Sequence, residues 1–164
     1  MAIGSCRTRL TLEVKQTGER SAGNPHAARE AFRDGYCTVG DLARRDEDGF
    51  YYLVDRKSNM IISGGENVYP SEVESMLGAH EHVKEVAVIG APDPKWGERV
   101  HAVVVLHSGA ASTEDELLAW CRDRIAGYKR PRSISFIGDN EMPRTATGKI
   151  LHRILKSRYS ERDT

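Results

Sequence analysis

The sequence predicts an α+β protein in which a small sheet is covered by helices. After Ser58, apolar runs of strand length alternate with segments whose apolar residues recur at helical spacing. Turn and capping signals separate these segments, and their order is strand, helix, strand, strand, helix, strand and a last helix. The 164 residues are 39% apolar and 29% charged, which is typical of one globular domain with an attached piece.

The part before Ser58 is less regular. Its predicted elements are a half-buried strand at Leu10 to Val14, a helix from Asn24-Pro25 through Phe32 that stops by Gly35, and strands at Tyr36 to Ala43 and Phe50 to Val54. Because Asp46-Glu47-Asp48-Gly49 is a turn signal, the last two strands are expected to form a hairpin. A charged junction follows, so we expect one unit over residues 1–57 and a second over residues 58–164.

Beyond the junction each element has a local reason. Pro70 opens a helix, and Thr113 with Glu116 makes a capping box at the start of another. The expected elements are a strand at Met60 to Ile62, a loop at Gly64 to Asn67, a helix from Pro70, strands at Val86 to Ile89 and Val100 to Leu106 joined by a loop at Ala91 to Glu98, a helix from Thr113 to Gly127, a strand at Ile134 to Ile137 and a helix from about Lys149 to Tyr159.

Composition narrows the class of protein. Lys and Arg number 24 and balance 24 Asp and Glu, so no overall basic charge favours nucleic acid or a membrane surface. The three cysteines are odd in number and widely spaced, which argues against a disulfide framework and a structural zinc site, and no metal site is predicted. No apolar run reaches the ~18–20 residues of a membrane span, and the N-terminus lacks a signal-peptide core. A cytoplasmic setting is expected.

The stretch Pro143 to Arg153 is a candidate anion site. Gly148 allows a tight turn or a close approach to a ligand, and Lys149 is expected near a helix start, where free N–H groups attract anions. A mobile ammonium there suits a phosphate or a developing oxyanion. A lysine that is merely solvated at a helix start explains the same residues equally well.

Six segments then occur in order: Gly40-Asp41-Leu42, Asp55-Arg56, Ile61 to Glu74 with its Ser-Gly-Gly-Glu-Asn-Val-Tyr-Pro run, Pro92-Asp93 with Trp96-Gly97-Glu98, Tyr128 to Pro131, and Pro143 to Lys149. Together they resemble the C-terminal end of the adenylate-forming enzymes, and among these the acyl- or aryl-acid–CoA ligases, over about Gly23 to Tyr159. The resemblance implies a mixed sheet for the C-terminal domain, preceded by a β-hairpin that belongs to the large domain.

The resemblance also implies a two-step chemistry. A carboxylate attacks the α-phosphate of ATP, which brings Mg²⁺ with it, and acyl-AMP and pyrophosphate form; the CoA thiol then displaces AMP. The small C-terminal domain swings between the two half-reactions. The implied roles are Lys149 for adenylation, Asp41 and Arg56 for the nucleotide, Ser58 for the hinge, and Gly64, Gly65, Trp96 and Tyr128 for CoA.

Each implied role has a plainer alternative. Asp41 could simply end a hairpin strand, and Arg56 could be a surface ion-pair residue. The two glycines could be a structural turn, and Trp96 or Tyr128 could only cover the core. The basic run Lys129 to Arg132 could suggest nucleic acid, but a solvated face or contacts to CoA phosphates suit a chain of zero net charge better.

The sequence also departs from the family pattern. Val39 stands where a threonine is usual, Ser58 where a lysine or aspartate is usual, and His152 where an arginine is common. The glycine-, serine- and threonine-rich phosphate loop and the acid pocket have no counterpart here, so whether the chain is itself an enzyme is left open. We expect this chain to be the C-terminal portion of an acid–CoA ligase. It is expected to be inactive alone and to act when it is joined to a large domain or works with one in trans. The alternative is a stand-alone, non-catalytic module that binds CoA, a nucleotide or a partner ligase.

Overall fold

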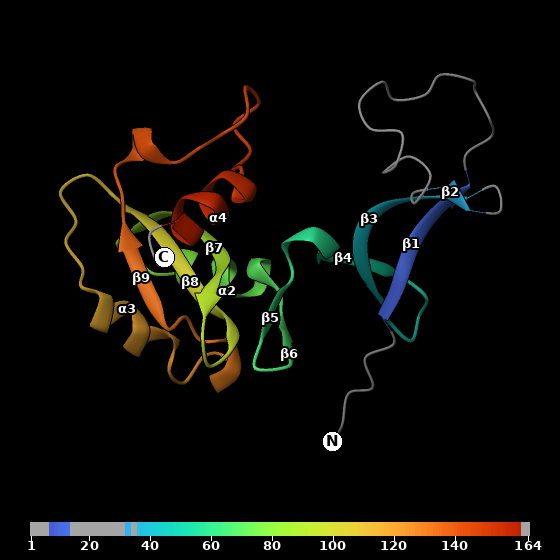
Figure 1. Cartoon of the computed structure of the whole chain (residues 1–164), viewed down its shortest axis with the longest axis horizontal. Coiled ribbons are helices and arrows are strands. Elements are labelled where there is room, and N and C mark those ends of the chain that lie inside the picture. The colour runs from blue at the N-terminus through green and yellow to red at the C-terminus, as the bar shows by residue number, and fades with distance from the viewer. Residues whose placement is uncertain (1–6, 14–31, 34–35, 162–164) are drawn as a thin grey trace. The chain divides into compact units, whose positions relative to one another are not determined.

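The computed structural model describes residues 7–13, 32–33 and 36–161, and the chain divides into two compact units, Met1–Ser58 and Asn59–Thr164 (Figure 1). The first unit is an antiparallel sheet built on β3 (Tyr36–Arg45). Its other strands, all paired with β3, are β1 (Arg7–Glu13), β2 (Phe32–Arg33) and β4 (Tyr51–Arg56).

The hairpin predicted before the junction is confirmed, because β3 and β4 pair in antiparallel register from Asp41↔Arg56 to Arg45↔Tyr51. The Asp46 carboxylate accepts the N–H of Phe50 at 2.8 Å and so closes the turn. The helix expected from Asn24 to Gly35 falls largely outside the described residues. Phe32, which that helix was expected to include, lies in β2 instead, because it pairs with Cys37 of β3.

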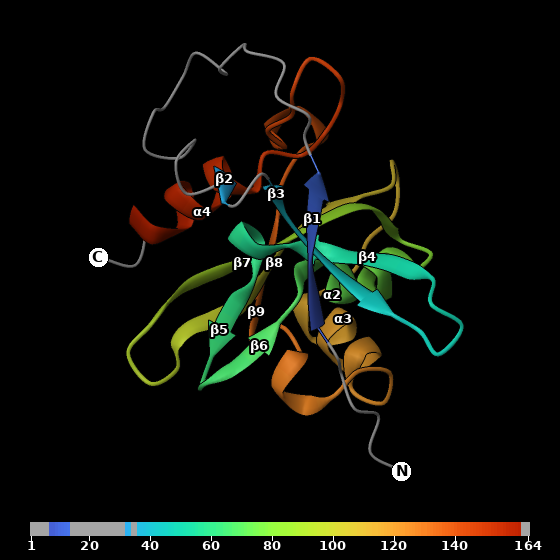
Figure 2. The ribbon, with the colours of Figure 1, turned by 90° about the vertical axis from the view of Figure 1, so that its right-hand side faces the viewer.

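The second unit contains a mixed five-stranded sheet, which confirms the predicted α+β class. The strand order is β6-β5-β8-β7, and β9 pairs with β8 in parallel while the other pairings are antiparallel. The strands are β5 (Ile61–Ser63), β6 (Glu66–Val68), β7 (Val83–Asp93), β8 (Gly97–Leu106) and β9 (Ser133–Phe136). Figure 2 shows β5 and β6 side by side, joined by a tight turn.

Helices cover both faces of this sheet, and alternate residues of β8 enter two separate cores. Val100, Ala102 and Val104 pack with α2 (Pro70–Gly78) and α3 (Glu114–Cys121). Val103 and Val105 instead pack with α4 (His152–Glu161), which contributes Leu155 and Tyr159. Because both faces of β7 and β8 are buried, their sequences read as nearly continuous apolar runs.

Several boundaries differ from the predictions. The expected loop at Gly64 to Asn67 contains β6, and the expected loop at Ala91 to Glu98 is mostly strand, since β7 reaches Asp93 and β8 begins at Gly97. The helix α3 ends at Cys121 rather than Gly127. The last helix begins at His152, three residues after Lys149. The described residues also include three short 3₁₀ turns: η1 (Lys57–Asn59), η2 (Gly127–Lys129) and η3 (Asp139–Glu141).

Candidate functional site

Lys149 lies on a narrow loop rather than at a helix start, which corrects the sequence-based placement. The loop runs from Pro143 to Leu151, and we call it the lysine loop. Its base is closed by an antiparallel bridge between Arg144 and Ile150 and by a hydrogen bond from the Leu151 N–H to the Pro143 carbonyl at 2.8 Å. The lysine therefore owes its position to a hairpin-like turn and not to the dipole of α4.

The tip of the lysine loop is held by its own polar groups. The Thr145 N–H donates to the Lys149 carbonyl at 2.8 Å, and the Gly148 N–H donates to the Thr145 carbonyl at 2.9 Å. Gly148 has φ +84°, a left-handed conformation that glycine adopts without strain. The Thr145 hydroxyl oxygen also accepts the Lys149 N–H at 3.1 Å and lies 2.9 Å from the Thr147 hydroxyl. Residues 145–149 are all exposed, so this ordered turn presents the lysine ammonium to the outside.

Gly64 and Gly65 form the two-residue turn between β5 and β6. Their φ angles are +60° and +85°, the combination that a type I′ hairpin turn requires. The Gly64 N–H donates to the carbonyl of Trp96 at 2.9 Å, so this turn lies directly against the β7–β8 connection. Two residues to which the resemblance assigned a CoA role are thus in contact.

Trp96 is the centre of a basic aromatic surface. The Asp93 carboxylate accepts the backbone N–H of Trp96 at 3.0 Å and that of Lys95 at 2.9 Å, which fixes the turn. The Arg132 guanidinium carbon lies 4.1 Å from the indole centroid, and the Lys95 ammonium lies 4.8 Å from it. These are cation–π distances, and the two positive charges beside a partly exposed ring suit an anionic ligand.

Tyr128 belongs to η2 and is 42% exposed. Its neighbour Lys129 donates to both carboxylate oxygens of Glu72, at 2.6 and 2.8 Å. Burial lowers the pKa of Lys129, but the hydrogen bond and charge of Glu72 outweigh this effect and raise it. Lys129 is therefore a paired cation near β6. Among the described residues, no hydrogen bond or ion pair joins Tyr128 or Lys149 to Trp96.

Asp41 and Arg56, the predicted nucleotide residues, are cross-strand partners in the first unit. The Arg56 Nε lies 3.4 Å from the Asp41 Oδ1, and their side chains are 68% and 27% exposed. An ion pair this exposed contributes little to stability. The structure thus brings the two residues together within the hairpin, and Ser58 follows in η1 at the end of the same unit.

Sequence reasoning missed two carboxylates that connect elements of the second unit. The Glu98 carboxylate accepts the Ile62 N–H at 3.0 Å and pairs with Lys156 at 2.6 Å, and so links β5 to α4. Glu74 accepts the Val88 N–H at 2.8 Å and lies 2.6 Å from His152 Nε2. Glu98 belongs to the Trp96-Gly97-Glu98 segment, and this motif was the signal in the sequence that could have marked it as a functional residue. Glu74 likewise ended the segment Ile61 to Glu74, but no role was predicted for it.

In the described part of the chain, no group of three or more histidine, cysteine, aspartate or glutamate side chains is placed to hold a metal ion. Likewise, none of the helices in the described ranges has the length and apolarity to cross a bilayer.

Comparison with known proteins identifies the family that this chain resembles. Residues 72–149 match the AMP-binding enzyme C-terminal domain. A feruloyl-CoA synthase of Amycolatopsis sp is 50% identical over 137 residues, which are 84% of this chain and 28% of that protein. A long-chain-fatty-acid–CoA ligase of Mycobacterium tuberculosis is 46% identical over 136 residues, 83% of this chain and 26% of that protein.

Solved structures give the same result. ATP-bound MatB from Rhodopseudomonas palustris has a TM-score of 0.78 at 36% identity, over 85% of this chain and 28% of MatB. An o-succinylbenzoate CoA synthetase from Bacillus subtilis, solved with its acyl-adenylate intermediate, has a TM-score of 0.73 at 42% identity, over 84% of this chain and 27% of the synthetase. This chain therefore spans little more than a quarter of the relatives it matches, and the family resemblance drawn from its motifs is confirmed.

Proposed function

Because this chain carries the C-terminal domain of the AMP-binding enzymes and is related to that part of the acid–CoA ligases, we propose that it acts as the C-terminal part of such a ligase. In this proposal Lys149 serves the adenylation step. The observation that carries it is the lysine loop, which holds the Lys149 backbone in a closed turn and leaves its ammonium exposed. An exposed ammonium on a backbone held in this way can stabilise charge on a substrate that lies outside this unit.

In the adenylation step the acid carboxylate attacks the α-phosphate of ATP, and pyrophosphate leaves with its Mg²⁺. Negative charge gathers on the phosphoryl oxygens and on the entering carboxylate, and the Lys149 ammonium would neutralise part of it. Asp41 would accept hydrogen bonds from ribose hydroxyls, since a carboxylate accepts from two adjacent donors, and Arg56 would contact the ribose or phosphate.

In the second step the CoA thiol displaces AMP from the acyl group. Rotation at Ser58 would bring the Gly64-Gly65 turn and Trp96 to the thiol side, as the family resemblance implies. The cation–π contacts of Arg132 and Lys95 around Trp96 support a site for the phosphate-bearing CoA, with Tyr128 as a further aromatic contact. Glycine at positions 64 and 65 leaves the backbone open to a narrow ligand.

We propose that residues 1–57 work with a large domain that supplies the phosphate loop and acid pocket. The 164 residues contain no glycine-, serine- and threonine-rich phosphate loop, so the chain by itself is expected to make no acyl-AMP. Acid-dependent pyrophosphate release by the pure chain would contradict this expectation. High-affinity CoA binding by the pure chain, without any gain of activity on fusion, would favour the stand-alone module instead.

The decisive experiment joins this chain to a relative. In a fusion, the matching 137 residues of the Amycolatopsis feruloyl-CoA synthase are replaced by the corresponding residues of this chain. We expect the fusion to release pyrophosphate in the presence of acid and ATP, and Lys149→Ala to slow that release by about 100-fold or more. Transfer from pre-formed acyl-AMP to CoA should be retained. Arg122→Ala, which removes an exposed cation from the same unit, is the control, and an equally active Lys149→Ala fusion would refute the proposal.

A further inference from the structure

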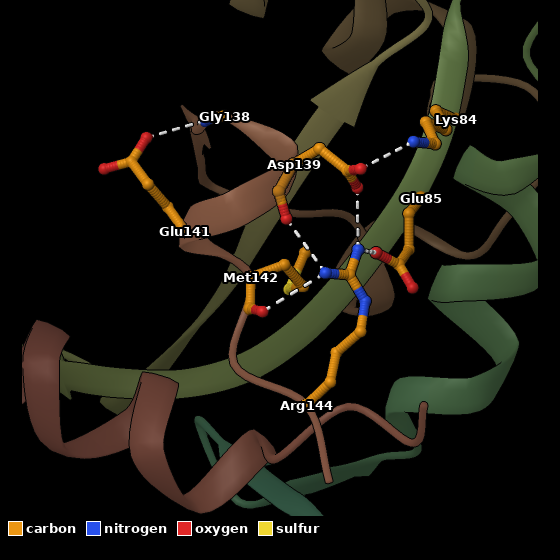
Figure 3. Close-up of polar contacts among 7 residues, drawn as sticks. All are labelled: Lys84, Glu85, Gly138, Asp139, Glu141, Met142 and Arg144. Atoms are coloured by element: carbon orange, nitrogen blue, oxygen red, sulfur yellow. Dashed lines mark hydrogen bonds and ion pairs between the residues drawn. The ribbon is translucent and has the colours of Figure 1, made fainter. Parts of the chain in front are cut away.

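Arg144 connects the base of the lysine loop to two other elements (Figure 3). Its Nη2 donates to the Glu85 carboxylate on β7 and to the Asp139 carboxylate on η3, the latter at 2.8 Å. Its Nη1 donates to the backbone carbonyls of Asp139 at 2.8 Å and Met142 at 3.3 Å. One guanidinium thus contacts two carboxylates and two carbonyls, a geometry that the planar arginine fork allows and a lysine does not.

The partners of Arg144 are themselves held in place. Lys84 of β7 pairs with Asp139 at 2.8 Å, and the Gly138 N–H donates to Glu141 at 2.7 Å, which closes the η3 turn. Met142 is buried in the core beneath α4. The hydrogen bond to Glu85 raises the pKa of Arg144, and the hydrogen bonds from Lys84 and Arg144 lower the pKa of Asp139. Both shifts favour the charged forms of Arg144 and Asp139.

The position of Arg144 in the chain links this network to Lys149. The backbone of Arg144 pairs with Ile150, the residue directly after Lys149, and the next residue, Thr145, exchanges hydrogen bonds with Lys149 itself. Beyond Arg144 the loop is exposed up to Lys149, so core packing does not hold its tip. Arg144 and Lys149 are therefore linked through a short set of hydrogen bonds between neighbouring residues of one loop.

We propose that Arg144 is a positioning residue for Lys149, which fixes the lysine loop on β7 and η3 so that the ammonium is presented in one place. This inference rests on the proposed function, because the contacts of Arg144 can serve catalysis only if Lys149 takes part in adenylation. Arg144 itself does not contact substrate in this proposal. A displacement of about 1 Å at a reacting group can reduce a rate by about 100-fold, so even a partly loosened loop would be measurable.

The first test uses the intact 164-residue chain and does not depend on activity. Hydrogen exchange is measured for the amides of Thr145, Gly148 and Leu151 in wild type and in Arg144→Met. We expect exchange at these amides to accelerate by about tenfold or more, while the Leu117 amide in α3 is unchanged. The matched control is Arg158→Met, which removes an arginine that donates to the Glu141 carbonyl at 3.0 Å without touching the loop. Unchanged exchange in Arg144→Met would overturn the positioning role.

The second test uses the fusion described above. Arg144→Met is expected to lower the turnover rate of adenylation by about 10- to 100-fold with little change in KM for ATP, and to leave acyl transfer from acyl-AMP unaffected. Arg144→Lys, which restores one ion pair but not the fork, should recover only part of the rate. An equal loss in both half-reactions would indicate general damage and refute the inference. If the wild-type fusion is inactive, or if Lys149→Ala leaves it active, the proposed function fails, and hydrogen exchange alone then decides whether Arg144 fixes the loop.

Discussion

The indole ring of Trp96 occupies the space that a side chain at Gly64 would need. A Cβ placed on Gly64 would lie 2.6 Å from the Trp96 Cε3, closer than any real contact allows, while the Gly64 N–H donates to the Trp96 carbonyl. The neighbouring Gly65 has a similar positive φ but no atom within 4 Å of the equivalent position. The two glycines of one turn are thus constrained for different reasons.

Gly64→Ala is therefore expected to destabilise the protein more than Gly65→Ala. Both substitutions place alanine in the left-handed region, at a cost of about 1–2 kcal/mol. Only Gly64→Ala also clashes with the indole, which adds about 1–3 kcal/mol. Urea unfolding of the two variants measures the difference, and tryptophan fluorescence should change only in Gly64→Ala. Equal destabilisation would mean that Trp96 moves away freely.

The capping box of α3 provides a second prediction. Thr113 Oγ1 accepts the Glu116 N–H at 3.2 Å, and the Glu116 carboxylate accepts the Thr113 N–H at 2.9 Å. Thr113→Ala should lower the free energy of unfolding by about 1 kcal/mol, because a helix N–H loses its partner. Thr113→Ser keeps the hydroxyl and is the control. A loss as large in Thr113→Ser would assign the effect to the methyl group rather than to the cap.

The attachment of α4 to the sheet depends on Leu155, which is 1% exposed in the core that also contains Met142. Leu155→Ala should lower the free energy of unfolding by about 2–5 kcal/mol, because it leaves a cavity between α4 and β7. The exposed Arg153 on the same helix, changed to alanine, should have a small effect. Denaturant unfolding followed by circular dichroism distinguishes the two.

The interactions of Asp139 predict that the stability of the protein depends on pH. Hydrogen bonds from Lys84 and Arg144 lower its pKa in the folded protein below the ordinary value. A carboxyl with a lowered folded pKa stabilises the protein above its unfolded pKa, and this contribution is lost as the pH falls through the folded pKa. The urea midpoint of Asp139→Asn should therefore lie below that of wild type at pH 7, and the gap should narrow as the pH falls below the ordinary aspartate pKa of about 3.9 and through the lowered pKa of the folded protein.

Asp123→Asn, which changes an exposed carboxylate in the turn after α3, serves as the control for net charge. A gap between wild type and Asp139→Asn that stayed constant from pH 7 to pH 3 would show that the carboxylate charge is not responsible.

Features with a local cause could be predicted from the sequence. The Thr113–Glu116 box begins a helix, the turn before Phe50 closes a hairpin, and the apolar runs of β7 and β8 become buried strands. The motif order also identified the family correctly. The capping box, the turn and each apolar run are signals that lie within a few residues.

The strand β6 was missed although its signal is local. Glu66 and Asn67 are polar and were predicted as loop, but the positive φ angles of Gly64 and Gly65 fold the segment back onto β5.

Features that depend on contacts with other segments could not be predicted. Lys149 was predicted at a helix start. The pairing of Arg144 with Ile150 instead places Lys149 in a loop, and the helix begins only at His152. The contact between Arg144 and Glu85 joins residues 59 positions apart, and no local pattern reports it.

Every described contact that shapes the lysine loop comes from the Asn59–Thr164 unit, including Glu85 on β7, Asp139 on η3 and the buried Met142. If Lys149 serves adenylation, as we propose, then Lys149 and the residues that hold its loop belong to one segment of the gene and are inherited together. A gene that acquires a new acid-binding region by recombination would keep this arrangement intact, since none of its supports lies in the exchanged segment. Divergence in the acids used and retention of the adenylation chemistry would then be separate evolutionary events, each open to selection without the other.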